Sequence, residues 1–98
     1  MSYSVIAKEQ IPFCFLSKED VLENDHQRKR RKDQLQKAAH HNRLFHTRAK
    51  IIFDTIDETK EVNANIWEVT DNHVMLKGGI NIPVNCVREV ILESERRT

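Results

Sequence analysis

The stretch Arg48-Ala-Lys-Ile-Ile-Phe-Asp-Thr55 decides the fold. Apolar side chains recur in it at every second position, at Ala49, Ile51 and Phe53. A period of two residues is typical of a β-strand that places one face on a core. The pattern therefore predicts that the chain changes from helix to strand at about residue 48.

Four more short apolar segments follow, separated by turn sequences rich in Asp, Asn and Gly. Asp and Asn side chains bond their own backbone and so favour tight turns. Five short strands with no helix between them predict an antiparallel sheet, which buries itself best by curling into a small barrel. The four further strands are expected within 62–69, 74–76, 80–84 and 87–92.

Two of these strands have features of their own. The adjacent Ile66 and Trp67 indicate a strand that bends or is buried on both faces. Pro83 lacks the N–H that a strand donates to its neighbour, so its strand is expected at the edge of the sheet.

The segment 17–47 precedes the sheet and is rich in charged helix formers. We expect a helix over 18–46, broken near 23–25, because Gly and Pro are absent there. Ser17 is the expected cap of its first free N–H groups. The fold class is thus α+β, with a basic helix followed by a five-stranded, strongly bent antiparallel sheet or small barrel over 48–93.

The two ends of the chain carry weaker patterns. Residues 1–16 form an apolar lead-in, in which Pro12 disfavours a helix. Phe13 and Phe15 favour an extended segment docked on the core. Residues 94–98 are expected to be a frayed tail.

The length of 98 residues fits one small domain. Its net charge of +1 is a cancellation between two unlike halves. Residues 1–50 contain 11 Lys and Arg against 6 Asp and Glu, whereas residues 51–98 contain 5 against 9. The charges are therefore +5 on the helical half and −4 on the strand half.

Cysteine usage and hydropathy give an expected location. Cys14 and Cys86 lie far apart in short apolar stretches, which predicts buried free thiols and a reducing compartment. The start of the chain lacks the pattern of a signal peptide. The longest mainly apolar run, 11–16, is far shorter than the ~20 residues that span a bilayer. We therefore expect a cytoplasmic protein with no membrane partner.

A run of five cations is the sharpest functional feature. Such a block attracts phosphates and makes affinity depend on salt. Consecutive helical positions point in all directions, so these cations cannot share one face, and a helix kept in solution by its charges is the favoured interpretation of the run alone. An acidic protein partner would use the same charges. The candidate nucleic-acid-binding residues are Arg28, Lys29, Arg30, Arg31, Lys32, Arg43 and Arg48.

Trp67 is the second candidate for contact with a ligand. On a barrel surface it would stack a base or anchor a partner. Packing in the core is the more frequent situation for a tryptophan and is the favoured interpretation.

Other chemistry has little support in the sequence. His40 and His41 are adjacent and His46 lies farther on, so no pair has the helical spacing of metal ligands. Gly78 and Gly79 lack the Lys and Ser/Thr of a phosphate-binding loop. We expect no metal, no cofactor and no enzymatic activity.

Three stretches carry a resemblance to known families. They are 51–53 with the turn after it, 62–76 with Asp71 just before a strand, and the short turn 82–87 into the last strand. A helix followed by five short, bent strands resembles the Sm-like fold and the wider SH3-like barrels. The whole chain also resembles small uncharacterised bacterial proteins that have a basic helix ahead of a valine–tryptophan strand and an LKGG-x-x-IP segment, here 76–83.

These observations predict a small binding module. The first hypothesis is nucleic-acid binding through the basic helix, with RNA preferred because of the Sm-like resemblance. The alternative is a structural or protein-interaction module that forms a homo-oligomer or docks an acidic partner. In that case the basic helix of one copy meets the acidic strand half of another.

Overall fold

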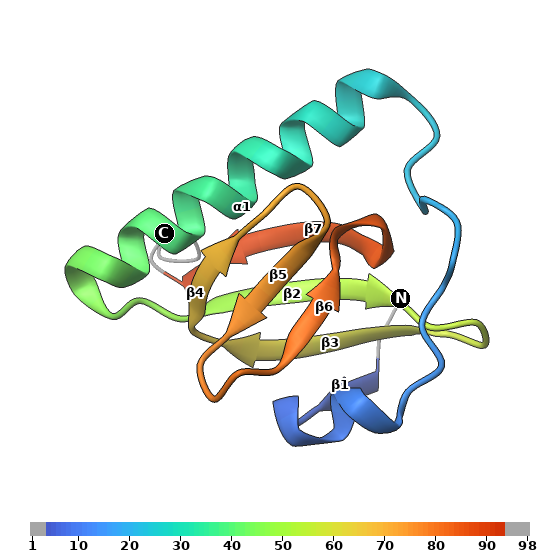
Figure 1. The fold of residues 1–98 in the computed structure, drawn as a ribbon, viewed down its shortest axis with the longest axis horizontal. Helices are drawn as coiled ribbons and strands as arrows, with labels where there is room; N and C mark the ends of the chain where they lie inside the picture. The colour runs from blue at the N-terminus through green and yellow to red at the C-terminus, as the bar shows by residue number, and fades with distance from the viewer. Residues whose placement is uncertain (1–3, 94–98) are drawn as a thin grey trace.

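The strand that begins at Ala49 lies inside a four-stranded sheet of order β1-β3-β2-β7 (Figure 1). The computed structural model describes residues 4–93. β2 pairs antiparallel with β3 and with β7, while β1 pairs parallel with β3. The strands are β1 (Ser4–Ile6), β2 (Ala49–Asp54), β3 (Thr59–Ala64) and β7 (Val87–Leu92).

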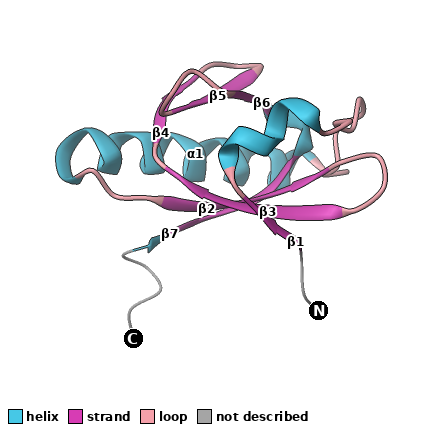
Figure 2. Ribbon diagram, turned by 90° about the horizontal axis from the view of Figure 1, so that it is seen from below, coloured by secondary structure: helices cyan, strands magenta, loops and turns pink. Residues whose placement is uncertain are grey.

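A second, three-stranded sheet has the order β4-β5-β6 and is antiparallel throughout. The two sheets form two layers, and the single long helix α1 (Asp25–Phe45) lies along one side of them, in contact with β4 and β7 (Figure 2). The α+β class is thus confirmed. The remaining elements are β4 (Ile66–Val69), β5 (His73–Leu76), β6 (Asn81–Pro83) and the short 3-10 helices η1 (Lys8–Phe13) and η2 (Val84–Cys86).

The predicted strand 62–69 bends so sharply that it belongs to both sheets. Asn65 separates β3 from β4, and its side-chain amide donates to Oδ1 of Asn42, 2.8 Å away. A bulge follows, since Ile66 pairs with Leu76 and Glu68 pairs with Met75. The bend expected near residue 66 is confirmed, and it carries the chain from one layer to the other.

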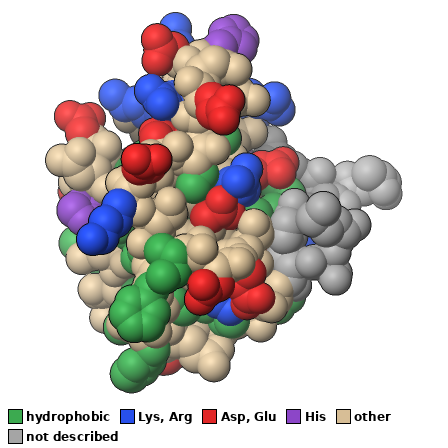
Figure 3. Space-filling view, turned by 90° about the vertical axis from the view of Figure 1, so that its right-hand side faces the viewer, with side chains coloured by type: hydrophobic (Ala, Val, Ile, Leu, Met, Phe, Trp, Pro, Cys, Tyr) green, Lys and Arg blue, Asp and Glu red, His purple; other side chains and the backbone are tan. Residues whose placement is uncertain are grey.

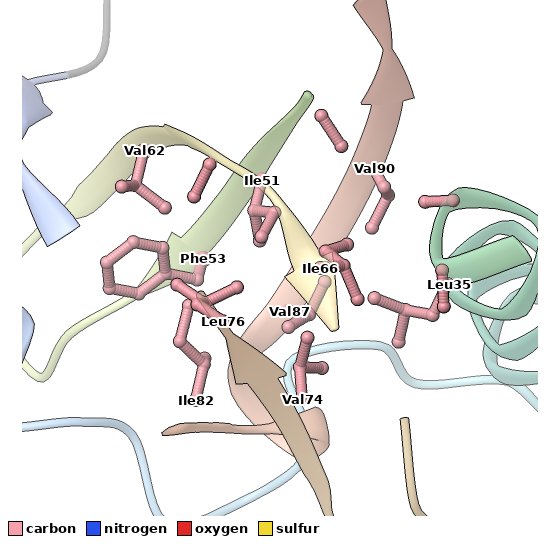
Figure 4. Packing of buried hydrophobic residues seen from close by; sticks show 14 of the residues in the cluster. Leu35, Ile51, Phe53, Val62, Ile66, Val74, Leu76, Ile82, Val87 and Val90 are labelled. Carbon is pink, nitrogen blue, oxygen red and sulfur yellow. The ribbon is translucent and has the colours of Figure 1, made fainter. Parts of the chain in front are cut away.

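The core fills the space between the two layers and α1 (Figure 4). Ile51 and Phe53 of β2 are completely buried, as their period of two predicts. Leu35 of α1 points into the same cluster. Each side chain of this size stabilises the fold by about 1.5–3 kcal/mol on full burial. Further members from both sheets are Val62, Ile66, Val74, Leu76, Ile82, Val87 and Val90.

The helix begins later than expected. Asn24 is its N-cap, and the side-chain oxygen accepts a hydrogen bond from the N–H of Gln27 at 2.8 Å. The predicted cap Ser17 instead donates its hydroxyl to the carbonyl of Glu19. Residues 17–24 therefore form an irregular segment, and the break expected near 23–25 is the true start of α1. The helix ends at Phe45, followed by His46 in the left-handed conformation (φ 54°).

The lead-in differs from the prediction in two ways. η1 contains Pro12, so this part of the chain is a 3-10 helix rather than an extended segment. Phe13 and Phe15 are 84 % and 74 % exposed, so the expectation that they dock on the core is wrong. Ile11 is the buried residue of this segment. Leu16 packs against the core and forms an isolated bridge with Thr55.

The strands of residues 4–93 do not close into a barrel. β6 and β7 are edge strands of different sheets, and η2 connects them directly. Pro83 therefore lies in an edge strand, as predicted. The expected frayed tail, 94–98, lies outside the described residues. Within the described range, no helix has both the length and the apolar character needed to cross a membrane.

Candidate nucleic-acid interface

The inward face of α1 is built from small and apolar residues with one charged exception. Leu35, Ala38 and Ala39 are buried on this face with Asn42. Arg31 lies one turn before Leu35 and is only 5 % exposed. The fourth residue of the five-cation run therefore points into the protein.

Arg31 is held by a carboxylate that the sequence does not place near it. Its two terminal nitrogens donate to Oδ1 and Oδ2 of Asp20 at 2.9 and 2.8 Å, and one also donates to the carbonyl of Val87 at 3.1 Å. Nε has no hydrogen-bond partner among residues 4–93. This geometry joins the segment before α1, the helix and β7 at one point. Arg31 is thus unavailable to an external phosphate in this conformation.

Asp20 titrates as a member of this buried pair. Burial raises the pKa of its carboxyl, but the hydrogen bonds from Arg31 and from the N–H of Leu22, with the nearby positive charges, outweigh that effect. The pKa is therefore below its ordinary value. The sequence gives no local signal for this pair, because Asp20 and Arg31 are 11 residues apart and belong to different structural segments.

Arg28 lies at the border of the same cluster. Its Nε donates to the carbonyl of Leu22 at 2.9 Å and lies 3.5 Å from a carboxylate oxygen of Asp20. A terminal nitrogen lies 3.6 Å from the fully exposed Asp25. Arg28 therefore contacts the segment before α1 and the first turn of the helix, while 43 % of its side chain remains exposed to solvent.

The remaining cations of the run lie on two different flanks of α1. Lys29, Lys32, Gln36 and Arg43 follow each other at spacings of three, four and seven residues, which places them along one flank. We call these four residues the basic flank. Arg30 lies on the other flank, where it lines a shallow pocket with Arg88 and Glu89 of β7. Gln36 is a member that charge alone does not reveal, although its helical spacing from Lys32 indicates it.

The basic flank faces β4 and the turn after it. Nζ of Lys32 lies 3.6 Å from Oδ1 of the exposed Asp71 in that turn. Gln36 and Arg43 line a shallow pocket together with Glu68 and Val69 of β4. Within residues 4–93, neither Lys29 nor Arg43 forms an ion pair. Among these residues the flank therefore presents two cations without an acidic partner and one with an exposed, replaceable partner.

Arg48 does not belong to this flank. It follows α1, and its Nε lies 3.9 Å from a carboxylate oxygen of Glu93, with both side chains about half exposed. At this distance and exposure the pair contributes little to stability. Arg48 lies instead near the C-terminal end of α1.

Trp67 is on the surface. It is 46 % exposed, so the favoured interpretation as a core residue is wrong. The physical reason is the bulge of β4, in which Trp67 is the extra residue between Ile66 and Glu68 and is not paired across the ladder. Glu68, its immediate neighbour, lines the pocket beside Arg43. The tryptophan thus lies on the strand next to the basic flank.

Other titratable groups have structural partners. Burial raises the pKa of Asp54, but its hydrogen bonds with Arg88 and Thr59 and the charge of Arg88 lower it below its ordinary value. Burial raises the pKa of the Cys86 thiol, which donates to the carbonyl of Ser17. Among the residues described, no group of three or more His, Cys, Asp or Glu side chains comes together to hold a metal.

Comparison of the chain with protein-family models, with curated proteins and with solved structures gives no match. The resemblance to Sm-like and SH3-like barrels therefore remains a prediction.

Proposed function

We propose that this chain is a non-catalytic binding module that holds single-stranded RNA along the basic flank, with Trp67 as a stacking platform. The observation that carries the proposal is the arrangement of Lys29, Lys32 and Arg43 on one exposed side of α1, next to the strand of an exposed tryptophan. Proteins bind single-stranded nucleic acids in this way: cations follow the sugar–phosphate backbone, and the bases stack on aromatic side chains.

The dimensions fit a short oligonucleotide. Lys29 and Arg43 are 14 residues apart, which is about 21 Å along a helix. The bases would then turn toward β4, where the ring of Trp67 offers a π-face.

Two acidic residues modulate the same surface. Asp71 is the partner of Lys32, and Glu68 lies in the pocket with Arg43. The Lys32–Asp71 pair is exposed and so contributes little, which allows a phosphate to replace the carboxylate. Replacing Asp71 by Asn should therefore strengthen RNA binding, whereas a surface unrelated to Lys32 would show no change.

The fold and location belong to the same proposal. We propose an Sm-like arrangement, because the strands follow the order β7-β2-β3 and β4-β5-β6, with η2 as the short connection into the last strand. We also propose a cytoplasmic location, because both cysteines are free thiols.

The test is a charge-matched comparison of two double variants in an RNA-binding titration. Lys29→Gln with Arg43→Gln removes two cations of the flank, and Lys18→Gln with Lys77→Gln removes two exposed cations outside α1. Fluorescence anisotropy with a labelled single-stranded RNA gives the salt dependence of affinity. The flank variant should lower the log–log salt slope by roughly 1.4, or about 0.7 for each phosphate that is no longer neutralised. Equal binding by the two variants would contradict the proposal.

The stacking role of Trp67 has its own comparison. Trp67→Ala should weaken RNA binding by about 5- to 150-fold, since stacking contributes roughly 1–3 kcal/mol per base. Trp67→Phe keeps an aromatic face and should retain most of the affinity. If both substitutions have the same effect, Trp67 is not a platform.

A further inference from the structure

The exposed phenylalanines of the lead-in form an apolar patch on a fixed scaffold. Phe13 and Phe15 lie beside the turn between β2 and β3, which carries the exposed Ile56. The N–H of Ile56 donates to the carbonyl of Phe15 at 2.8 Å, and Leu16 bridges to Thr55. Because backbone bonds hold the two segments together, the exposure of these side chains is a property of the fold.

A groove with an acidic rim accompanies this patch. Its volume is about 550 Å³, and its lining includes both phenylalanines with Asp57, Glu58 and Lys60. Lys60 pairs with Glu58, which leaves the carboxylate of Asp57 as the unbalanced charge of the rim. Figure 3 shows hydrophobic side chains gathered on this face with acidic side chains beside them. We call this surface the acidic groove.

A second apolar surface lies at the C-terminal end of α1. Leu44 and Phe45 are both exposed there, and Phe45 is in tilted ring contact with His41. The exposed cations Arg43 and Arg48 flank them in the sequence, and Arg48 is the member that faces a carboxylate, that of Glu93 at 3.9 Å. We call this surface the basic helix end.

The two surfaces are complementary in charge, and both carry unburied aromatic rings. They also lie at opposite ends of the molecule. In Figure 1, where the longest axis is horizontal, α1 ends at the left, whereas the turn between β2 and β3 is at the far right. A contact between them within one chain is therefore excluded, and a contact between two chains uses one surface of each.

We infer that two copies of this chain associate head to tail, with Leu44 and Phe45 of one copy seated in the acidic groove of the next. The contact buries the aromatic side chains of both surfaces and brings Arg43 and Arg48 toward Asp57. It is heterologous, so each added copy leaves one free groove and one free helix end, and the assembly grows until it closes into a ring or continues as a filament. A second copy is the occupant because the chain itself carries a matching surface.

The test is a mixing experiment with two surface variants, followed by sedimentation velocity. Phe15→Ser removes one of the two aromatic side chains that line the groove and keeps the helix end, whereas Phe45→Ser removes the aromatic side chain of the helix end and keeps the groove. The wild type should form oligomers that grow with concentration up to about 1 mM, where a contact with a Kd of about 1 mM is still measurable. Each variant alone should be monomeric. An equimolar mixture should form dimers and nothing larger, because only one intact groove and one intact helix end can meet.

The outcomes separate this contact from the other arrangements. Oligomers of Phe45→Ser like those of the wild type would indicate a groove-to-groove contact and overturn the inference, as would a mixture that remains monomeric. A monomeric wild type at about 1 mM would show that a second copy is not the occupant. The control is Trp67→Ser, which removes another exposed aromatic outside both surfaces and should assemble as the wild type does. Because both phenylalanines are exposed, unchanged thermal unfolding of both variants is the expected check that they are folded.

Discussion

Arg31 and its neighbours Lys29 and Arg30 belong to the same run of cations, but Arg31 is buried and the other two are exposed. Arg31 is 5 % exposed, is bound by both oxygens of Asp20 and donates to β7. Lys29 and Arg30 are exposed on the outer side of the same helical turn. A helix advances about 100° per residue, so a run of five cations must place at least one on the buried side. The run therefore contributes both a buried structural contact, the Asp20–Arg31 pair, which we call the anchor, and exposed cations such as Lys29 and Arg30.

The largest expected effect comes from breaking the anchor. Asp20→Asn removes the charge that balances Arg31, and an uncompensated buried cation destabilises a protein by roughly 3–5 kcal/mol. Because Asp20 is partly exposed, we expect about 3 kcal/mol, measured by urea denaturation at pH 7.

The matched control is Asp25→Asn, which removes a fully exposed carboxylate 3.6 Å from Arg28. It should change the free energy of unfolding by less than about 0.5 kcal/mol. Equal losses in the two variants would show that burial does not distinguish Arg31 from its neighbours.

A second prediction uses pH to remove the same charge reversibly. The pKa of Asp20 is depressed in the folded protein, so its contribution to stability is fully present above the unfolded pKa of about 4 and is lost as the pH falls through the folded pKa. The stability difference between wild type and Asp20→Asn should therefore shrink as the pH falls below about 4. Denaturant titrations at a series of acidic pH values measure it. A difference that stays constant down to pH 2 contradicts this assignment.

The contrast between anchor and surface explains what the sequence could predict. The alternation of Ala49, Ile51 and Phe53 is local, and it locates β2 correctly, whereas β1 at Ser4–Ile6 has no such alternation. The pairing of Asp20 with Arg31 depends on where an irregular segment returns against α1, and no periodicity encodes it. The same holds for the surface candidates. The cations are visible as a run and helical spacing groups some of them on one flank, but which strand that flank faces follows only from the direction of the buried face.

Two apolar features depart from the prediction for a related reason. Phe13 and Phe15 resemble core residues by composition, yet their segment has no period that selects an inward face. Trp67 stands beside Ile66, and the bulge between Ile66 and Glu68 turns one of the two outward. Where the regular spacing of apolar residues is interrupted, hydrophobicity alone does not predict which residue is buried. The exposed apolar residues become candidates for binding only once the fold places them.

A third prediction concerns Asn24, the residue that caps the N-terminus of α1. Asn24 caps the helix at Gln27, and replacing such a cap by Ala costs about 1 kcal/mol. Asn24→Ala should therefore destabilise the protein by about 1 kcal/mol, measured by thermal unfolding. Ser17→Ala, at the cap that the sequence suggested, should have a smaller effect because Ser17 lies outside the helix. The reverse order would mean that α1 extends further toward the N-terminus in solution.

The smallest expected effect on stability is at the exposed cations. Lys29→Gln with Arg30→Gln should shift the free energy of unfolding by no more than about 0.5 kcal/mol, because surface substitutions of this kind are nearly neutral. This near-zero value separates the two roles of the run, because it would mean that the fold does not require these charges. Thermal unfolding of the double variant and of Asp20→Asn under the same conditions compares the smallest and the largest expected loss of stability. A loss as large as that of Asp20→Asn would mean that the fold depends on these two exposed cations as strongly as on the Asp20–Arg31 pair.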